Sequence, residues 1–106
     1  MNLKQFRRMW SDCQLVEIDR REAHGALWIL YNVTEPESTS NYGRHYGLYV
    51  VLNPAGQIIG HNMHNTSDNQ DGNWIKQVKE WWERHLIEGL VDRGQQQISL
   101  EELHVH

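Results

Sequence analysis

The sequence predicts an α+β fold with a short N-terminal helix, a four-stranded antiparallel meander and a long C-terminal helix packed on one face of the sheet. Apolar residues recur at a helical period near both ends of the chain. The segment between them is rich in β-branched and aromatic residues, interrupted by turn residues. A sheet with one face covered by helices buries such stripes economically. The 106 residues suit a single domain, residues 1–106.

The N-terminal helix is predicted over residues 2–12. Its apolar side chains share one stripe, and Lys4, Arg7 and Arg8 lie on the opposite side. The stripe consists of Leu3, Phe6, Met9, Trp10 and Cys13. Because the only cysteine lies on this apolar stripe rather than at a helix N-terminus, we expect it to be a core residue and not a nucleophile.

The four strands are predicted as two hairpins. Residues 13–20 alternate between apolar and polar side chains, residues 26–34 are rich in aromatic and β-branched ones, and a turn glycine lies between them. The second hairpin joins residues 45–53 and 57–63 through the sequence NPAG. Proline at the second position of this turn and glycine at the fourth indicate a type I turn.

The C-terminal helix is predicted from Trp74 onward. Its apolar side chains form two adjoining lines that span an arc of roughly 140° at 3.6 residues per turn. The two lines are Trp74, Val78, Trp81 and His85, and Ile75, Trp82 and Leu86. Gly89 falls within the arc, where a missing side chain lets a neighbour approach closely, and Gly94 is predicted to end the helix.

The tail, residues 95–106, leaves two alternatives open. Ser99 followed by Glu102 has the pattern that opens a short helix. Ile98 and Leu100 instead suit an edge strand.

The apolar arc of the C-terminal helix is wider than the stripe of about 100° that a surface helix commonly buries. The short N-terminal helix has few apolar side chains to cover the excess. We therefore expect one of Trp81 and Trp82 to stay partly exposed and to lie in an interface with a second copy or with a partner.

The polar stretch GHNMHNTSDNQDG holds the candidate metal ligands His61, His64, Asp68 and Asp71. If the strand continues past the first histidine, residues three apart point to opposite faces, and the two histidines cannot share a metal. No zinc-binding motif supports the site. We therefore expect no metal and favour a strand-to-helix connection in which Ser, Asp and Asn side chains cap the helix.

His61 is expected on the same sheet face as Ile59 and Met63, because residues two apart in a strand share a face. On an apolar face it would be at least half buried. Burial disfavours the charged form, so we expect this imidazole to be neutral at pH 7.

Charge and composition exclude several functions. The formal net charge is −4, divided into +2 over residues 1–21 and −6 over the rest, which is too acidic for general nucleic-acid binding. No apolar run approaches the roughly 18 residues of a membrane span. The chain also lacks a secretory signal and a pair of cysteines, so we expect a cytoplasmic protein.

The polar residues 35–43 are expected to form a mobile surface loop. At its end the sequence places Tyr42, Arg44, His45 and Tyr46, and aromatics with arginine are typical of binding surfaces. The alternative is a hairpin crossover with partly buried tyrosines.

These observations favour a small non-catalytic module that binds another protein, such as an accessory or inhibitor protein of a phage or mobile element. Its expected binding residues are the four on the loop together with Trp81 and Trp82. No cofactor motif occurs, and the partner is another protein or a second copy. The alternatives are a small metal-dependent enzyme using the stretch from His61 to Asp71, and a ligand-binding module with a pocket between sheet and helix.

Overall fold

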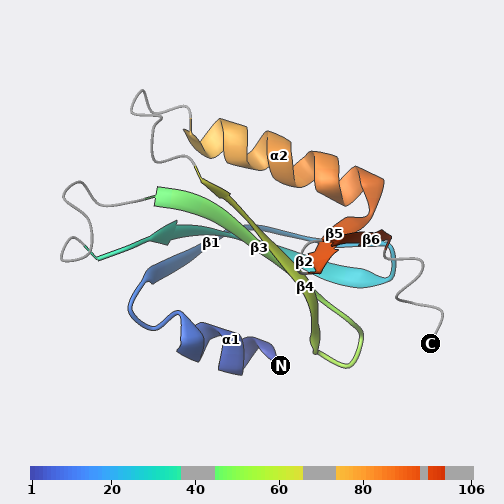
Figure 1. Cartoon of the computed structure of the whole chain (residues 1–106), viewed down its shortest axis with the longest axis horizontal. Helices are drawn as coiled ribbons and strands as arrows, with labels where there is room; N and C mark the ends of the chain where they lie inside the picture. Colours follow the sequence, from blue (N-terminus) through green and yellow to red (C-terminus); the bar gives the residue numbers. More distant parts are fainter. Residues whose placement is uncertain (37–44, 66–73, 94–95, 100–106) are drawn as a thin grey trace.

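The computed structural model describes residues 1–36, 45–65, 74–93 and 96–99 (Figure 1). The elements in chain order are α1 (Leu3–Met9), β1 (Gln14–Ala23), β2 (Ala26–Thr34), β3 (His45–Leu52), β4 (Ile58–Asn65), α2 (Trp74–Glu88), β5 (Leu90–Arg93) and β6 (Gln96–Ser99). The predicted fold class is confirmed: a short helix, a four-stranded antiparallel sheet and a C-terminal helix packed against it. Among the described residues, no helix is long and apolar enough to cross a membrane.

The sheet is a meander with strand order β1-β2-β3-β4. The first hairpin turns through His24 and Gly25, whose φ angles of 54° and 72° fit the two-residue type I′ turn that matches strand twist. In the second hairpin the Gly56 N–H donates to the Asn53 carbonyl at 2.9 Å, as the predicted four-residue turn requires.

The two helices lie on opposite faces of the sheet (Figure 1). The prediction of helices on one face of the sheet only is wrong. Its cause lies in β2, where Trp28 and Leu30 pack toward α2 while Ile29 and Tyr31 pack toward α1. A strand that is apolar on both faces needs cover on both.

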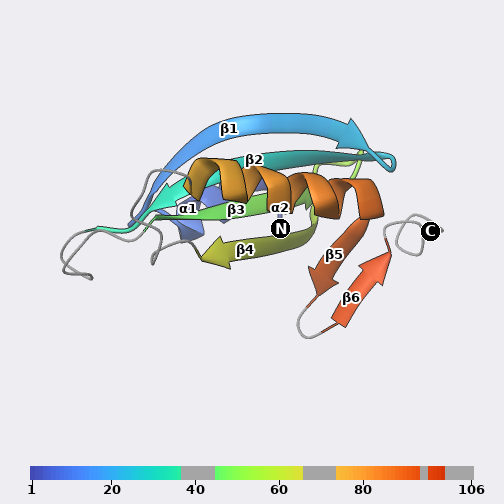
Figure 2. The ribbon, with the colours of Figure 1, turned by 90° about the horizontal axis from the view of Figure 1, so that it is seen from above.

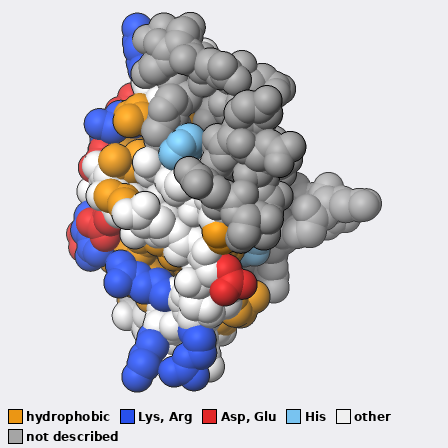
Figure 3. Space-filling model, turned by 90° about the vertical axis from the view of Figure 1, so that its left-hand side faces the viewer, with side chains coloured by type: hydrophobic (Ala, Val, Ile, Leu, Met, Phe, Trp, Pro, Cys, Tyr) orange, Lys and Arg blue, Asp and Glu red, His pale blue; other side chains and the backbone are white. Residues whose placement is uncertain are grey.

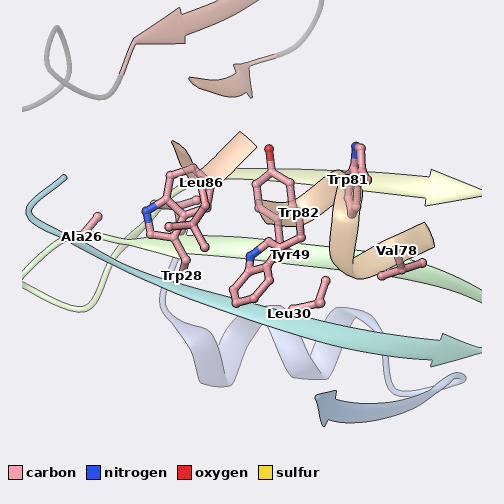
Figure 4. Close-up of a cluster of buried hydrophobic side chains, with 9 residues drawn as sticks. Ala26, Trp28, Leu30, Tyr49, Val78, Trp81, Trp82 and Leu86 are labelled. Atoms are coloured by element: carbon pink, nitrogen blue, oxygen red, sulfur yellow. The ribbon is translucent and has the colours of Figure 1, made fainter. Parts of the chain in front are cut away.

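The face under α2 is closed by large aromatic side chains, which Figure 4 shows in close-up. Val78 packs against Gly47 on β3, where a Cβ would lie 2.5 Å from the valine Cγ1. Trp81 is 7% exposed and Trp82 is fully buried. The expectation that one of these tryptophans stays partly exposed is therefore wrong, because the sheet offers α2 a wide apolar face.

Helix α2 ends earlier than predicted. Gly89 adopts a φ of 66° and its N–H donates to the His85 carbonyl at 2.8 Å, so Gly89 and not Gly94 ends the helix. The predicted close approach at Gly89 is confirmed, since a Cβ there would lie 2.9 Å from the His24 ring. That ring also lies 2.7 Å from the Leu86 carbonyl, one of the groups that a helix end leaves without an intrahelical partner.

The chain after α2 forms a second, two-stranded sheet of β5 and β6 beside the main one (Figure 2). Of the two alternatives for the tail, a strand is found over Gln96–Ser99, which includes Ile98. Residues 100–106 lie outside the described part of the chain, as do residues 37–44 of the expected mobile loop.

Candidate functional site: a methionine-lined groove between α1 and β4

Helix α1 is short but firmly placed. Asn2 and Gln5 form a capping box, in which each side chain accepts a hydrogen bond from the other's backbone N–H, at 2.8 and 2.9 Å. Phe6 is buried in the sheet and packs against Trp10, with ring centroids 6.0 Å apart. The edge of Trp10 meets Tyr46 at 6.1 Å. These contacts fix α1 over the middle of the sheet.

Between α1 and the edge strand β4 runs an open groove with a volume of about 640 Å³. Its surface is mostly apolar. The lining residues are Met1, Phe6, Met9, Trp10, Ile58, Ile59, Gly60, His61, Asn62 and Met63. The chain has three methionines, and all of them lie in this lining. Met1 is 54% exposed, Met9 68% and Met63 53%. The side chain of Met9 is therefore exposed, although the sequence placed it on the apolar stripe of the helix.

A β-bulge at Ile59 decides which side chains of β4 face the groove. Ile58 pairs with Leu52 and Gly60 with Val51, so Ile59 is an extra residue on β4. The bulge reverses the alternation that an unbroken strand would have. Ile59 packs against the core under α2, while Ile58 packs against the core under α1.

This reversal determines the face on which His61 lies. It pairs with Val50 and shares the α1 face with Met63, and its ring lies 6.4 Å from that of Phe6. The imidazole is exposed, so the expectation of a half-buried His61 beside Ile59 is wrong. Alternation alone did not locate the bulge, although Gly60 beside Ile59 is the residue type that often marks one in a strand.

His64 lies on the other face, as residues three apart in a strand require. Its ring stacks on Trp81 with centroids 5.2 Å apart, and Trp81 in turn contacts Tyr49 and His85 at 5.0 and 5.4 Å. Burial lowers the pKa of His64, and the nearby positive charges of Arg84 and His85 lower it further.

The two histidines are thus separated by the sheet and cannot share a metal ion. Asp68 and Asp71 lie outside the described residues. Over the described ranges, no group of three His, Cys, Asp or Glu side chains is close enough to hold a metal.

The expected binding residues on the loop are only partly described. Tyr42 and Arg44 lie outside the described residues. His45 is exposed at the start of β3, where its Nδ1 lies 3.1 Å from the Thr34 hydroxyl. Tyr46 is buried on the α1 face, and its hydroxyl donates to Glu35 at 3.2 Å.

The Tyr46 hydroxyl is a poor acid in this position. Burial raises its pKa, and the Glu35 carboxylate raises it further. Burial also raises the pKa of the neighbouring Cys13 thiol, which agrees with the prediction of a packing role for the only cysteine. This corner of the fold holds no activated nucleophile among the described residues.

Positive charge gathers on α1. Lys4, Arg7 and Arg8 are all exposed, and the helix carries no acidic residue. Figure 3 shows lysine and arginine side chains along the lower edge of the molecule, the level at which Figure 1 places α1. Arg7 leans over the Tyr31 ring at 5.7 Å, which leaves Lys4 and Arg8 as the freer charges on the outer side of α1.

Neither a protein-family model, nor a curated protein, nor a solved structure matches this chain.

Proposed function

We propose that this protein is a non-catalytic interaction module that binds a partner protein through the groove between α1 and β4. One observation carries the proposal: every methionine of the chain lies in the groove, and each is more than half exposed. Methionine is flexible and polarisable, and it is used where a surface must adapt to a partner. Apolar side chains exposed together in one place typically mark an interaction site.

The chemistry of the lining supports a binding role rather than catalysis. Among the described lining residues, only His61 has an ionisable side chain. General acid–base or nucleophilic catalysis needs partners that orient and activate such a group. The described side chains beside this imidazole within the groove are apolar, because the Asn62 side chain points to the other face and donates to the Tyr49 hydroxyl.

A small apolar ligand is the second candidate, and the volume of about 640 Å³ favours it. Ligand pockets usually enclose roughly 70–90% of a small molecule. Here the three methionines remain more than half exposed to water, so the groove is open along its length. An open groove suits a longer partner that supplies its own cover.

The test is affinity capture from extracts of the source organism with three baits: the wild-type protein, a double variant Met9→Lys/Met63→Lys, and a control Val16→Lys. Val16 is 46% exposed on β1, away from the groove. We expect wild type and control to retain the same protein and the double variant to lose it, with binding weaker by about 2 kcal/mol or more. Capture that all three baits share would contradict the proposal.

The cytoplasmic location and the association with a phage or mobile element stay predictions. The same holds for the binding roles of Tyr42, Arg44, His45 and Tyr46. Trp81 and Trp82 are buried under α2 and offer a partner little surface in this conformation.

A further inference from the structure

On the basis of this proposed function, we propose how the partner binds: as an extended segment that adds a strand to the outer edge of β4. Its apolar side chains would enter the groove, and its acidic side chains would face the basic surface of α1. Four observations on the described residues support this mode, and they concern the edge, its existing contact, its charge and the charge of α1.

The first observation is the position of β4 at the edge of the sheet. β4 is the last strand in the sheet order, and β5 lies beside it but pairs with β6 in a separate sheet. Beyond a single bridge at Gln57, no described residue pairs with the outer edge of β4. Alternate residues of an edge strand direct N–H and C=O groups outward, which is the arrangement that an added strand uses.

The second observation is that this edge already accepts an extended segment. Asn2 forms an antiparallel bridge with Gln57, and the Ile58 N–H donates to the Met1 carbonyl at 2.7 Å. Met1 and Asn2 therefore pair as an extended segment with the start of β4. A partner strand would continue the same ladder along Gly60–His64, next to the groove.

The third observation is the contrast between the two edges of the sheet. β1, at the other edge, carries five charged side chains: Glu17, Asp19, Arg20, Arg21 and Glu22. β4 carries no Asp, Glu, Lys or Arg over its full length. Charged side chains on an edge strand discourage pairing with another chain, so β1 is protected and β4 is not.

The strand alternation explains why edge and groove act together. In an added strand every second side chain would point to the α1 face, where His61 and Met63 already lie. Those side chains would enter the groove between β4 and α1. The backbone of the partner would give affinity, and the groove would select its apolar residues.

The fourth observation is the positive charge of α1, which favours an acidic segment over a second copy of this chain. Pairing β4 with its own copy would place two α1 helices on the same face of one joined sheet. Each helix carries Lys4, Arg7 and Arg8 without an acidic residue, so the two would repel. A segment with aspartate or glutamate would instead be attracted.

The experiment begins with a library of random linear decapeptides selected against the full chain. We expect enrichment of sequences in which apolar residues alternate with polar ones and in which Asp and Glu exceed Lys and Arg. A selected peptide is then titrated into protein labelled with ¹³C at the methionine methyl groups. All three methionines line the groove, so all three signals should shift.

Peptide backbone methylation tests strand addition itself. N-methylation of alternate amides removes either the donors that face β4 or those that face solvent. We expect methylation of the amides that face β4 to weaken binding by roughly tenfold or more, and methylation of the amides that face solvent to change it little. Lys4→Glu/Arg8→Glu should weaken binding and reduce its dependence on salt. The matched control is Arg20→Glu on β1.

The outcomes separate this inference from the proposed function. The methionine signals could shift while methylation of neither set of amides weakens binding. The partner would then bind the groove without adding a strand, and only this inference fails. If enriched peptides lack acidic residues, or if sedimentation shows a dimer that Met63→Lys abolishes, the acidic partner is wrong. If no peptide is enriched, strand addition by a linear segment is wrong, while capture of a folded protein still tests the groove.

Discussion

The two faces of one sheet differ in how completely a helix covers them. The fifteen-residue α2 lies over one face, and Trp81, Trp82 and Leu86 pack into the aromatic core around Tyr49. The seven-residue α1 lies over the other and buries only Phe6 fully. The strands present buried apolar side chains on both faces, so the difference in cover follows the lengths of the two helices.

If the groove binds a partner as proposed, this difference separates the face that stabilises the fold from the face that binds. On the α2 face the large apolar side chains are buried in the core, where they contact one another. The α1 face keeps a margin along β4 where methionines remain in water. Under the proposed function this margin is the binding surface, and it lies beside the strand that ends the sheet order.

The sharpest way to break the comparison is Trp82→Ala. This side chain is fully buried, and we expect a loss of about 3–5 kcal/mol in the free energy of unfolding, measured by urea titration. Trp10→Ala on the α1 face is the matched variant. Because Trp10 is only partly buried between Phe6 and Tyr46, it should cost clearly less. Equal losses would mean that the two faces contribute alike.

The next effect concerns how closely α2 approaches the sheet. Gly47→Ala places a Cβ 2.5 Å from the Val78 side chain, and we expect overpacking to cost about 1–3 kcal/mol. In the double variant Gly47→Ala/Val78→Ala the clash is removed, so the combined loss should be smaller than the two single losses together. Strict additivity in urea titrations would show that α2 does not rest on Gly47.

The sequence was sufficient for what depends on local pattern and insufficient for what depends on packing. The helices at Leu3 and Trp74 and the turn at Gly56 follow from periodicity and turn chemistry, and the structure contains all three. The bulge at Ile59 is a property of pairing with β3, and it moved His61 to the face of α1. The end of α2 depends on the φ of Gly89 beneath His24, a tertiary contact.

The groove could not be predicted for the same reason. Met9 and Met63 are distant in sequence, and they line one surface only because α1 packs on the face opposite α2. Their shared residue type was the one available signal. Two methionines indicate a common surface only when it is known that both lie on the same face of the sheet.

A smaller effect distinguishes the faces by pH. The pKa of His64 is lowered by burial against α2, and by the positive charges of Arg84 and His85. In the unfolded chain this histidine has a pKa of about 6.5. The unfolded chain therefore binds a proton at His64 more readily than the folded chain does. The contribution of neutral His64 to the free energy of unfolding should be fully present above about pH 6.5 and should be lost as the pH drops through that value toward the lowered pKa.

The variant His64→Phe keeps a ring on Trp81 without a titrating group. Its unfolding free energy, measured by urea titration at intervals between pH 7.5 and 5, should fall less steeply than that of wild type. A wild-type slope in the His64 variant would show that this histidine does not couple pH to the docking of α2.

The smallest expected effect on stability is the one that matters most for function. Met9→Gln and Met63→Gln change side chains that are 68% and 53% exposed, so each should alter the unfolding free energy by no more than about 0.5 kcal/mol. Glutamine has nearly the same length as methionine but replaces its apolar end with an amide. Partner binding should therefore weaken while the fold is unchanged. If either substitution costs as much as a core truncation, that methionine packs in the fold, and the margin of the α1 face is not a free surface.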